Sequence, residues 1–239
     1  MIRSYSFFIY VFYLCTASFT LHAQDSIPNK YGLVVIHTIQ SLQKTIQKNP
    51  EKEIIDLVRY IPGLAMDMKY IGTDHFLQTS LYDSMAMPYA RKPLATALAT
   101  VQAELNEQGL GLKIWDAYRP YQVTQQIWKK VPDNRYAADP ATGSAHNRGM
   151  AIDLTLIHLN DQQELDMGTR FDHFSDTAHH DFNNLPTQIK ANRNLLKSVM
   201  MKYGFVALNS EWWHYHFQPA KEFEILDISF KDLAAALKK

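Results

Sequence analysis

Residues 144–153 read Ser-Ala-His-Asn-Arg-Gly-Met-Ala-Ile-Asp, and the predicted fold is built around this stretch. His146 and Asp153 stand seven positions apart, with Gly149 between them as a point where the chain can turn. From residue 150 to 156, Met, Ile and Leu alternate with smaller or polar residues, a pattern typical of a strand with one apolar face. The stretch therefore predicts a turn and a strand that bring an imidazole and a carboxylate to one point.

A second stretch, Glu-Trp-Trp-His at residues 211–214, offers another carboxylate and another imidazole. A catalytic zinc typically has three His, Asp or Glu ligands at about 2.0–2.2 Å and one open position. Together the two stretches predict one zinc ion per chain, held by two His and one Asp, with Glu211 left to act on the attacking water. Spacing alone leaves the third ligand open, because His214 and His216 share one face of the strand predicted over 212–217.

Taken singly, each of these residues also has an ordinary structural explanation. His146 could be a loop histidine and Asp153 a strand residue facing solvent, while at least one of the two tryptophans is expected to pack in the core. Arg119 follows a predicted strand and suits an oxyanion at an attacked carbonyl, but it could equally be a surface residue paired with a local aspartate. The combination Ser-x-His-x2-Gly-x-Ala-x-Asp as a unit favours the metal site.

The rest of the chain mixes helix and strand patterns without regular alternation and without a glycine-rich phosphate loop. This favours a single α+β domain with a central antiparallel sheet flanked by helices. Apolar spacing and helix-stop residues predict helices over residues 32–48, 93–105, 121–130 and 185–203. Alternation predicts strands over 65–70, 112–116, 150–156 and 212–217, and the long stretches 71–91, 131–149 and 157–184 are expected to be loops.

Composition and the N-terminal residues bound the function. The 239 residues are 46% hydrophobic, carry no net charge and contain no basic block, so a packed core is expected and nucleic acid is not an expected partner. Residues 1–23 resemble a secretory signal peptide, with Arg3 ahead of an apolar run and Ala23 at the cleavage position. The run is shorter than a membrane span of about 20 residues, so stable membrane insertion after its removal is not expected, although an uncleaved anchor is the alternative.

These features predict a protein exported across the inner membrane, in the periplasm. The only cysteine, Cys15, lies inside the predicted signal peptide, so neither a disulfide framework nor a cysteine nucleophile is expected in the mature chain. Residues 24–52 are predicted to be an N-terminal extension with one helix, and residues 53–239 the catalytic domain.

Four motifs occur in an order that resembles the VanX-type D-alanyl-D-alanine dipeptidases, zinc enzymes of the D-Ala-D-Ala peptidase and Hedgehog fold group. They are Asp-Ala-Tyr-Arg-Pro at 116–120, the stretch from 144 to 156, Met-Gly-Thr-Arg-Phe-Asp at 167–172, and Glu-Trp-Trp-His-Tyr at 211–215. The resemblance covers roughly residues 55 to 225. It implies a small D-amino-acid dipeptide as substrate.

The resemblance also implies a role for each matched residue. His146, Asp153 and His214 would be the zinc ligands, which selects His214 over His216. Glu211 would be the general base and Arg119 would stabilise the tetrahedral intermediate. Asp172 and Ser144 would hold the amino terminus of the substrate.

The implied activity is zinc-dependent hydrolysis of D-Ala-D-Ala to two D-alanines, in cell-wall peptide turnover or salvage. Salvage is favoured because the resistance enzymes of the family are cytoplasmic, whereas this chain has a predicted export signal. One alternative is a zinc D,D- or L,D-carboxypeptidase or endopeptidase acting on peptidoglycan stem peptides. The other is a catalytically silent wall-binding module, which the presence of both Glu211 and Arg119 disfavours.

Overall fold

The computed structural model describes residues 28–238 and is organised around a five-stranded sheet. The predicted signal peptide lies outside the described residues. The strand order is β3 (Ala65–Met66), β5 (Leu110–Asp116), β6 (Ala151–His158), β8 (His214–Phe217) and β7 (Phe205–Ala207). Only the β3–β5 pair of this sheet is parallel, so the sheet is antiparallel from β5 to β7.

The register of the three central strands positions the functional residues. Ile114 pairs with Leu154, and a shift in the ladder then sets Asp116 opposite Asp153. On the other side of β6, Asp153 pairs with His214. The strand is buried on both faces, with Ile152 and Leu154 fully covered on one face and Asp153 2% exposed on the other. The register therefore gathers polar groups in the interior at one end of the sheet.

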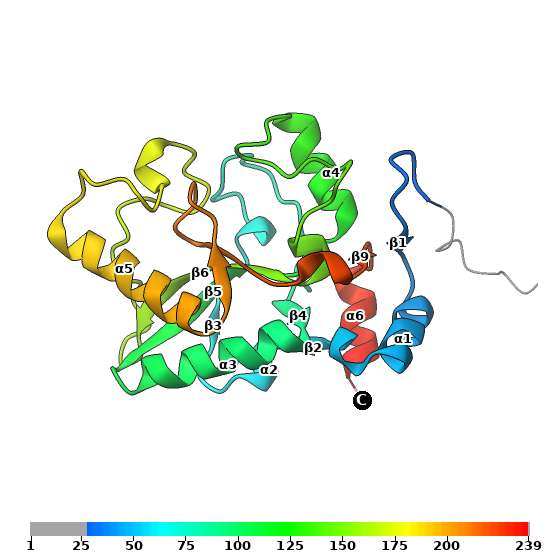
Figure 1. Cartoon of the computed structure of the whole chain (residues 1–239), viewed down its shortest axis with the longest axis horizontal. Helices are drawn as coiled ribbons and strands as arrows, with labels where there is room; N and C mark the ends of the chain where they lie inside the picture. The colour runs from blue at the N-terminus through cyan, green and yellow to red at the C-terminus, as the bar shows by residue number, and fades with distance from the viewer. Residues whose placement is uncertain (1–27, 239) are drawn as a thin grey trace, which may run out of the picture.

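Helices cover one side of the sheet. The helices α3 (Lys92–Asn106) and α5 (Thr187–Lys202) contact each other and pack against β5, β6 and β7. On the other side lie α4 (Tyr121–Lys130) and the long loops (Figure 1). Because the loops gather where β6 and β8 bring Asp153 and His214, the site lies on the loop side.

The N- and C-terminal segments pack together beside the sheet (Figure 1). The strand β1 (Val35–Ile36) pairs parallel with β9 (Ile225–Leu226), and α1 (Ile39–Lys48) contacts α6 (Phe230–Leu237). A further pair joins β2 (Ile54–Asp56) to β4 (Tyr89–Arg91), with the short helix α2 (Leu57–Tyr60) after β2. The division of the chain at residue 52 into extension and catalytic domain stays a prediction.

Several local predictions are confirmed and three are wrong in their bounds. The helices predicted over 93–105, 121–130 and 185–203 and the strands over 112–116 and 150–156 are present within a few residues. The helix predicted over 32–48 begins only at Ile39, since residues 35–36 pair with β9 and Thr38 caps the helix by accepting from the Ser41 amide. The α+β class with a central antiparallel sheet is confirmed.

The other two corrections have a packing cause. The strand predicted over 65–70 ends at Met66, because the chain turns at Lys69–Ile71 and buries Tyr70 to 2% exposure. The strand predicted over 212–217 begins at His214, because Trp212 and Trp213 precede it as core residues, 1% and 0% exposed. Within residues 28–238, no helix has the length and apolar character that a bilayer crossing requires.

Candidate active site

Two histidines and one aspartate converge at the loop side of the sheet. His146 lies in a 3-10 turn before β6, Asp153 lies on β6, and His214 is the first residue of β8. The His146 Nε2 atom is 3.2 Å from His214 Nδ1, and the Asp153 carboxylate oxygens are 2.9 Å from His214 Nδ1 and 3.4 Å from His146 Nε2. These three residues form a group that could hold a metal ion.

The donor set fits a tetrahedral zinc ion. Ligands at about 2.0–2.1 Å from a tetrahedral centre lie roughly 3.4 Å from one another, close to the separations found here. The His146 Nδ1 atom donates to the Ala117 carbonyl at 2.7 Å, so the lone pair of this imidazole is at Nε2, toward Asp153 and His214. Although burial opposes it, the two imidazoles lower the pKa of Asp153, which is therefore a carboxylate at neutral pH.

Glu211 lines the same cleft, which has a volume of about 290 Å³. Burial is the main reason that the pKa of Glu211 is raised to about 7, with a smaller contribution from Asp153 and an opposing one from His214. A divalent cation beside it would lower this pKa. A carboxyl group tuned in this way can accept a proton and return it near neutral pH.

Arg119 is paired with Asp116, as one alternative from the sequence predicted, but the pair is buried, and Arg119 lines the cleft. Its Nε and Nη2 atoms donate to Asp116 Oδ2 at 3.0 Å and 2.7 Å, and Nη2 lies 3.9 Å from Asp153 Oδ2. The Tyr82 hydroxyl donates to the other oxygen of Asp116 at 2.7 Å. Burial alone would lower the pKa of Arg119, yet Asp116 raises it, so the guanidinium is a fixed positive charge beside the triad.

Asp172 and Ser144 reach the cleft from two different loops. Asp172 has a left-handed backbone, with φ at 56°, and its carboxylate accepts from the Tyr70 hydroxyl at 3.0 Å. Burial, Glu211 and Asp153 raise the pKa of Asp172, because another negative charge there is unfavourable. The Ser144 hydroxyl accepts from the His146 amide at 3.2 Å, so it also supports the turn that carries His146.

All seven predicted site residues line this one cleft. They are Arg119, Ser144, His146, Asp153, Asp172, Glu211 and His214. His216 is not part of the group of possible metal ligands, although its ring centroid is 6.4 Å from that of His214. The geometry therefore favours His214 as the third ligand, the choice that the resemblance implied.

The sequence pattern of a peptidase family described as D-Ala-D-Ala dipeptidase matches residues 50–233. This chain belongs to that family. The membership confirms the resemblance drawn from the four motifs, and with it the predicted class of enzyme, a zinc metallopeptidase.

Two dipeptidases and one solved structure illustrate the similarity. A D-alanyl-D-alanine dipeptidase of Escherichia coli is 37% identical over 74% of this chain and 91% of its own length. Another, from Enterococcus faecium, is 31% identical over 65% and 86%. The solved D,D-pentapeptidase VanY, in complex with Zn(II), is 14% identical over 65% of this chain and 90% of that chain, with a TM-score of 0.35. A structural similarity of that size transfers no residue role to this dipeptidase family member.

The sequence missed several contacts that support the residues of the dipeptidase site, and one of the groups involved, Tyr70, lines the cleft itself. A pair between Arg119 and a local aspartate was one alternative from the sequence, but nothing in the spacing indicated that Asp116 would be buried with Arg119 and anchor it at the site. Tyr70 was predicted to be a strand residue, yet its hydroxyl holds Asp172 and its ring lies 5.1 Å from the Arg119 guanidinium carbon. The Ala117 carbonyl, which sets the His146 tautomer, carries no side-chain signal at all.

Gly149 is the turn residue on which the spacing of His146 and Asp153 depends. Its φ is 67°, and a Cβ added there would lie 3.2 Å from the Arg91 amide nitrogen and 3.3 Å from Arg91 Cγ. We expect Gly149→Ala to destabilise the protein by roughly 1–3 kcal/mol, through left-handed strain and the tight contact with Arg91, and to weaken zinc binding.

Urea unfolding and a zinc competition titration measure both effects. Gly109→Ala is the matched control, since Gly109 has φ at 72° but nothing within 4 Å of an added Cβ. It should carry the backbone strain alone and keep the affinity for zinc. If both variants bind zinc as the parent protein does, the close approach of Gly149 to Arg91 is not needed for the site.

Proposed function

We propose that this chain is a zinc dipeptidase that hydrolyses D-Ala-D-Ala to two D-alanines. One zinc ion per chain would be held by His146, Asp153 and His214. The observation that carries the proposal is the cleft of about 290 Å³, which contains both this triad and the carboxylate of Asp172. A small cleft with a metal-type centre and a separate anion suits a short substrate with a free amino terminus.

The residues around the triad suit peptide hydrolysis. A zinc ion held there would polarise the scissile carbonyl and lower the pKa of the attacking water. Glu211 takes the proton from that water and passes it to the leaving amine. Arg119, held by Asp116, stabilises the negative charge that develops on the carbonyl oxygen.

In this proposal, Asp172 selects substrates of dipeptide length by binding their free amino terminus. Its carboxylate is close enough to Glu211 and Asp153 for both to raise its pKa, so a cationic partner would stabilise its charged form. The ammonium group of a dipeptide is such a partner, and Ser144 offers a hydroxyl in the same cleft. An N-terminal extension of the substrate would remove the charge that Asp172 binds.

Substrate selection tests the proposal against the carboxypeptidase and endopeptidase alternative. Wild type should cleave D-Ala-D-Ala well, and should cleave N-acetyl-D-Ala-D-Ala, L-Ala-L-Ala and a stem pentapeptide poorly. A charge-assisted contact is worth about 1.5–3 kcal/mol, so Asp172→Ala should lower kcat/KM for D-Ala-D-Ala by about tenfold to a hundredfold. The loss on the N-acetylated substrate should be small.

Two results would count against the proposal. Equal cleavage of the free and N-acetylated dipeptides by wild type would mean that the enzyme does not recognise a charged amino terminus. That result would favour a carboxypeptidase. Zinc-loaded wild type that cleaves no member of the panel would favour a silent wall-binding module.

We also propose that the protein acts in the periplasm, in salvage of wall-derived dipeptides. Support comes from the signal-like residues 1–23. N-terminal sequencing of protein recovered from the periplasmic fraction tests this, and a full-length chain in the cytoplasm would contradict it.

A further inference from the structure

Asp172 lies on a long loop. This loop must be held in a fixed position if the Asp172 carboxylate is to bind the amino terminus of the substrate. We call residues 166–180 the Asp172 loop; its only helical turn is Asp176–Ala178. Loops of this kind are usually the mobile parts of a domain. A displacement of about 1 Å can lower the rate of an enzyme as much as a hundredfold. The structure therefore has to contain something that fixes the loop.

Arg193, on α5, bridges the two ends of this loop. Its Nε atom donates to the Met167 carbonyl at 2.7 Å, and its Nη1 atom donates to the carbonyls of Thr177 at 2.9 Å and His179 at 3.3 Å. The neighbouring Asn192 adds a bond from its side-chain amide to the Asp166 carbonyl at 2.8 Å. One guanidinium thus ties the residues before Asp172 to the residues after it.

The environment of Arg193 is unusual for a buried cation. The residue is 4% exposed, and within residues 28–238 no carboxylate lies within ion-pair distance of it. Burial lowers the pKa of Arg193 to about 10, against an opposing effect of Asp166, so the group still carries its charge at neutral pH. A buried charge is costly unless hydrogen bonds offset the loss of water. Backbone carbonyls of the loop accept from Nε and Nη1 of Arg193, while Nη2 is buried and has no hydrogen-bond partner among the described residues.

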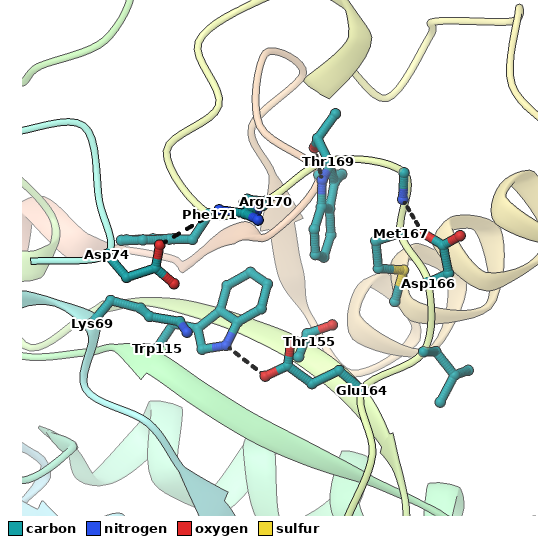
Figure 2. A pocket seen from close by; sticks show the side chains of 13 residues that line it. Lys69, Asp74, Trp115, Thr155, Glu164, Asp166, Met167, Thr169, Arg170 and Phe171 are labelled. Carbon is teal, nitrogen blue, oxygen red and sulfur yellow. Dashed lines mark hydrogen bonds and ion pairs between the residues drawn. The ribbon is translucent and has the colours of Figure 1, made fainter. Parts of the chain in front are cut away.

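The same contacts connect the Asp172 loop to the segment that carries Glu211. The Arg193 guanidinium lies 5.7 Å from the ring centroid of Trp212, the residue next to Glu211. The Trp212 indole N–H donates to Thr169 Oγ1 at 2.7 Å, and the Trp212 amide donates to the Ala178 carbonyl at 3.1 Å. Met167, Thr169 and Phe171 of this loop line a neighbouring cavity of about 570 Å³ (Figure 2).

We infer that Arg193 is a positioning residue that fixes Asp172 relative to Glu211 and the metal triad. The inference rests on the proposed role of Asp172 in holding the substrate's amino terminus. Arg193 does not line the active-site cleft, so any effect on catalysis has to pass through the loop or through Trp212. Because a binding contact acts on substrate and transition state alike, the effect should fall mainly on KM.

The test compares Arg193→Met and Arg193→Lys with wild type on D-Ala-D-Ala. Arg193→Met should raise KM by about tenfold to a hundredfold, with a smaller change in kcat and an unchanged zinc content. Arg193→Lys keeps the charge and can reach some of the carbonyls, so it should recover part of the loss. Lys202→Met is the matched control. Lys202 is an exposed cation on the same helix, and it pairs with Glu104, away from the loop.

A double-mutant cycle separates positioning from general stability. If Arg193 acts through Asp172, Arg193→Met should cost little further activity in an Asp172→Ala background, because the two losses are not additive. An equal loss in both backgrounds would overturn the inference, as would an unchanged KM in Arg193→Met. If Arg193→Met does not fold, the same cycle is run with Arg193→Lys.

Hydrogen exchange distinguishes failure of this inference from failure of the proposed function. Wild type without activity on D-Ala-D-Ala would contradict the proposed function alone. Amides of residues 168–180 should exchange faster in Arg193→Lys than in wild type, while those of β6 stay protected. Unchanged exchange in the Asp172 loop would overturn the inference whatever the substrate proves to be.

Discussion

Replacing His146, Asp153 or His214 with alanine is expected to remove zinc from the protein and abolish hydrolysis. Purified wild type should carry about one zinc per chain, because three protein ligands and one open position make a catalytic site. The three donor groups lie within 4.8 Å of one another, so each forms one corner of the same site. Loss of any corner leaves two ligands, too few to retain the ion.

His216→Ala is the matched control for these variants. His216 lies two residues after His214 on the same strand, but it does not belong to the group of possible ligands. It should keep about one zinc per chain and most of the activity. Elemental analysis of each purified variant provides the measurement. If His216→Ala loses zinc and His214→Ala keeps it, the assignment of the third ligand is wrong.

Glu211→Gln should retain zinc and the fold but lower kcat for D-Ala-D-Ala by at least about 10²-fold. Glutamine has nearly the shape of glutamate, but its amide cannot accept a proton from the attacking water. Burial of Glu211 beside Asp153 raises its pKa, so its neutral form is already tolerated in this place. The loss should therefore be one of chemistry rather than of structure.

Steady-state kinetics on zinc-replete protein measure this loss. Glu164→Gln is a suitable control, because it is the same substitution at a residue outside the cleft. The Glu164 carboxylate accepts from the Trp115 indole at 3.2 Å. This control should keep a kcat close to that of wild type. A near-normal kcat in zinc-replete Glu211→Gln would remove Glu211 from the mechanism.

The local sequence determined those helices and strands that carry a full periodic pattern of apolar residues within their own length. The helices near 92–106, 121–130 and 187–202 and the strand near 110–116 follow from apolar spacing and from their terminal Pro and Gly residues. Short elements such as β1 and β9 could not be predicted in this way. Each has two residues, and it is a strand only because the other lies beside it.

The site residues themselves could be named from the sequence, because their order along the chain resembles one family closely enough to give each position a role. All seven lie in the cleft. The roles stay predictions until the variants are measured. The motifs could not predict the geometry of the contacts that hold these residues. Examples are the buried ion pair of Arg119 with Asp116 and the hydrogen bond from the Tyr70 hydroxyl to Asp172.

Tertiary structure brings His214, which the resemblance had already selected, next to His146 and Asp153, and it holds the Asp172 loop in place. Spacing left His214 and His216 equivalent, and only the β6–β8 register sets His214 opposite Asp153. A shift of one residue would have turned these side chains to the other face of the sheet. Arg193 lies more than ten residues from each carbonyl it holds, and none of those carbonyls has a side-chain signature. Register and main-chain contacts between distant segments arise from packing, so they are absent from any local pattern of residues.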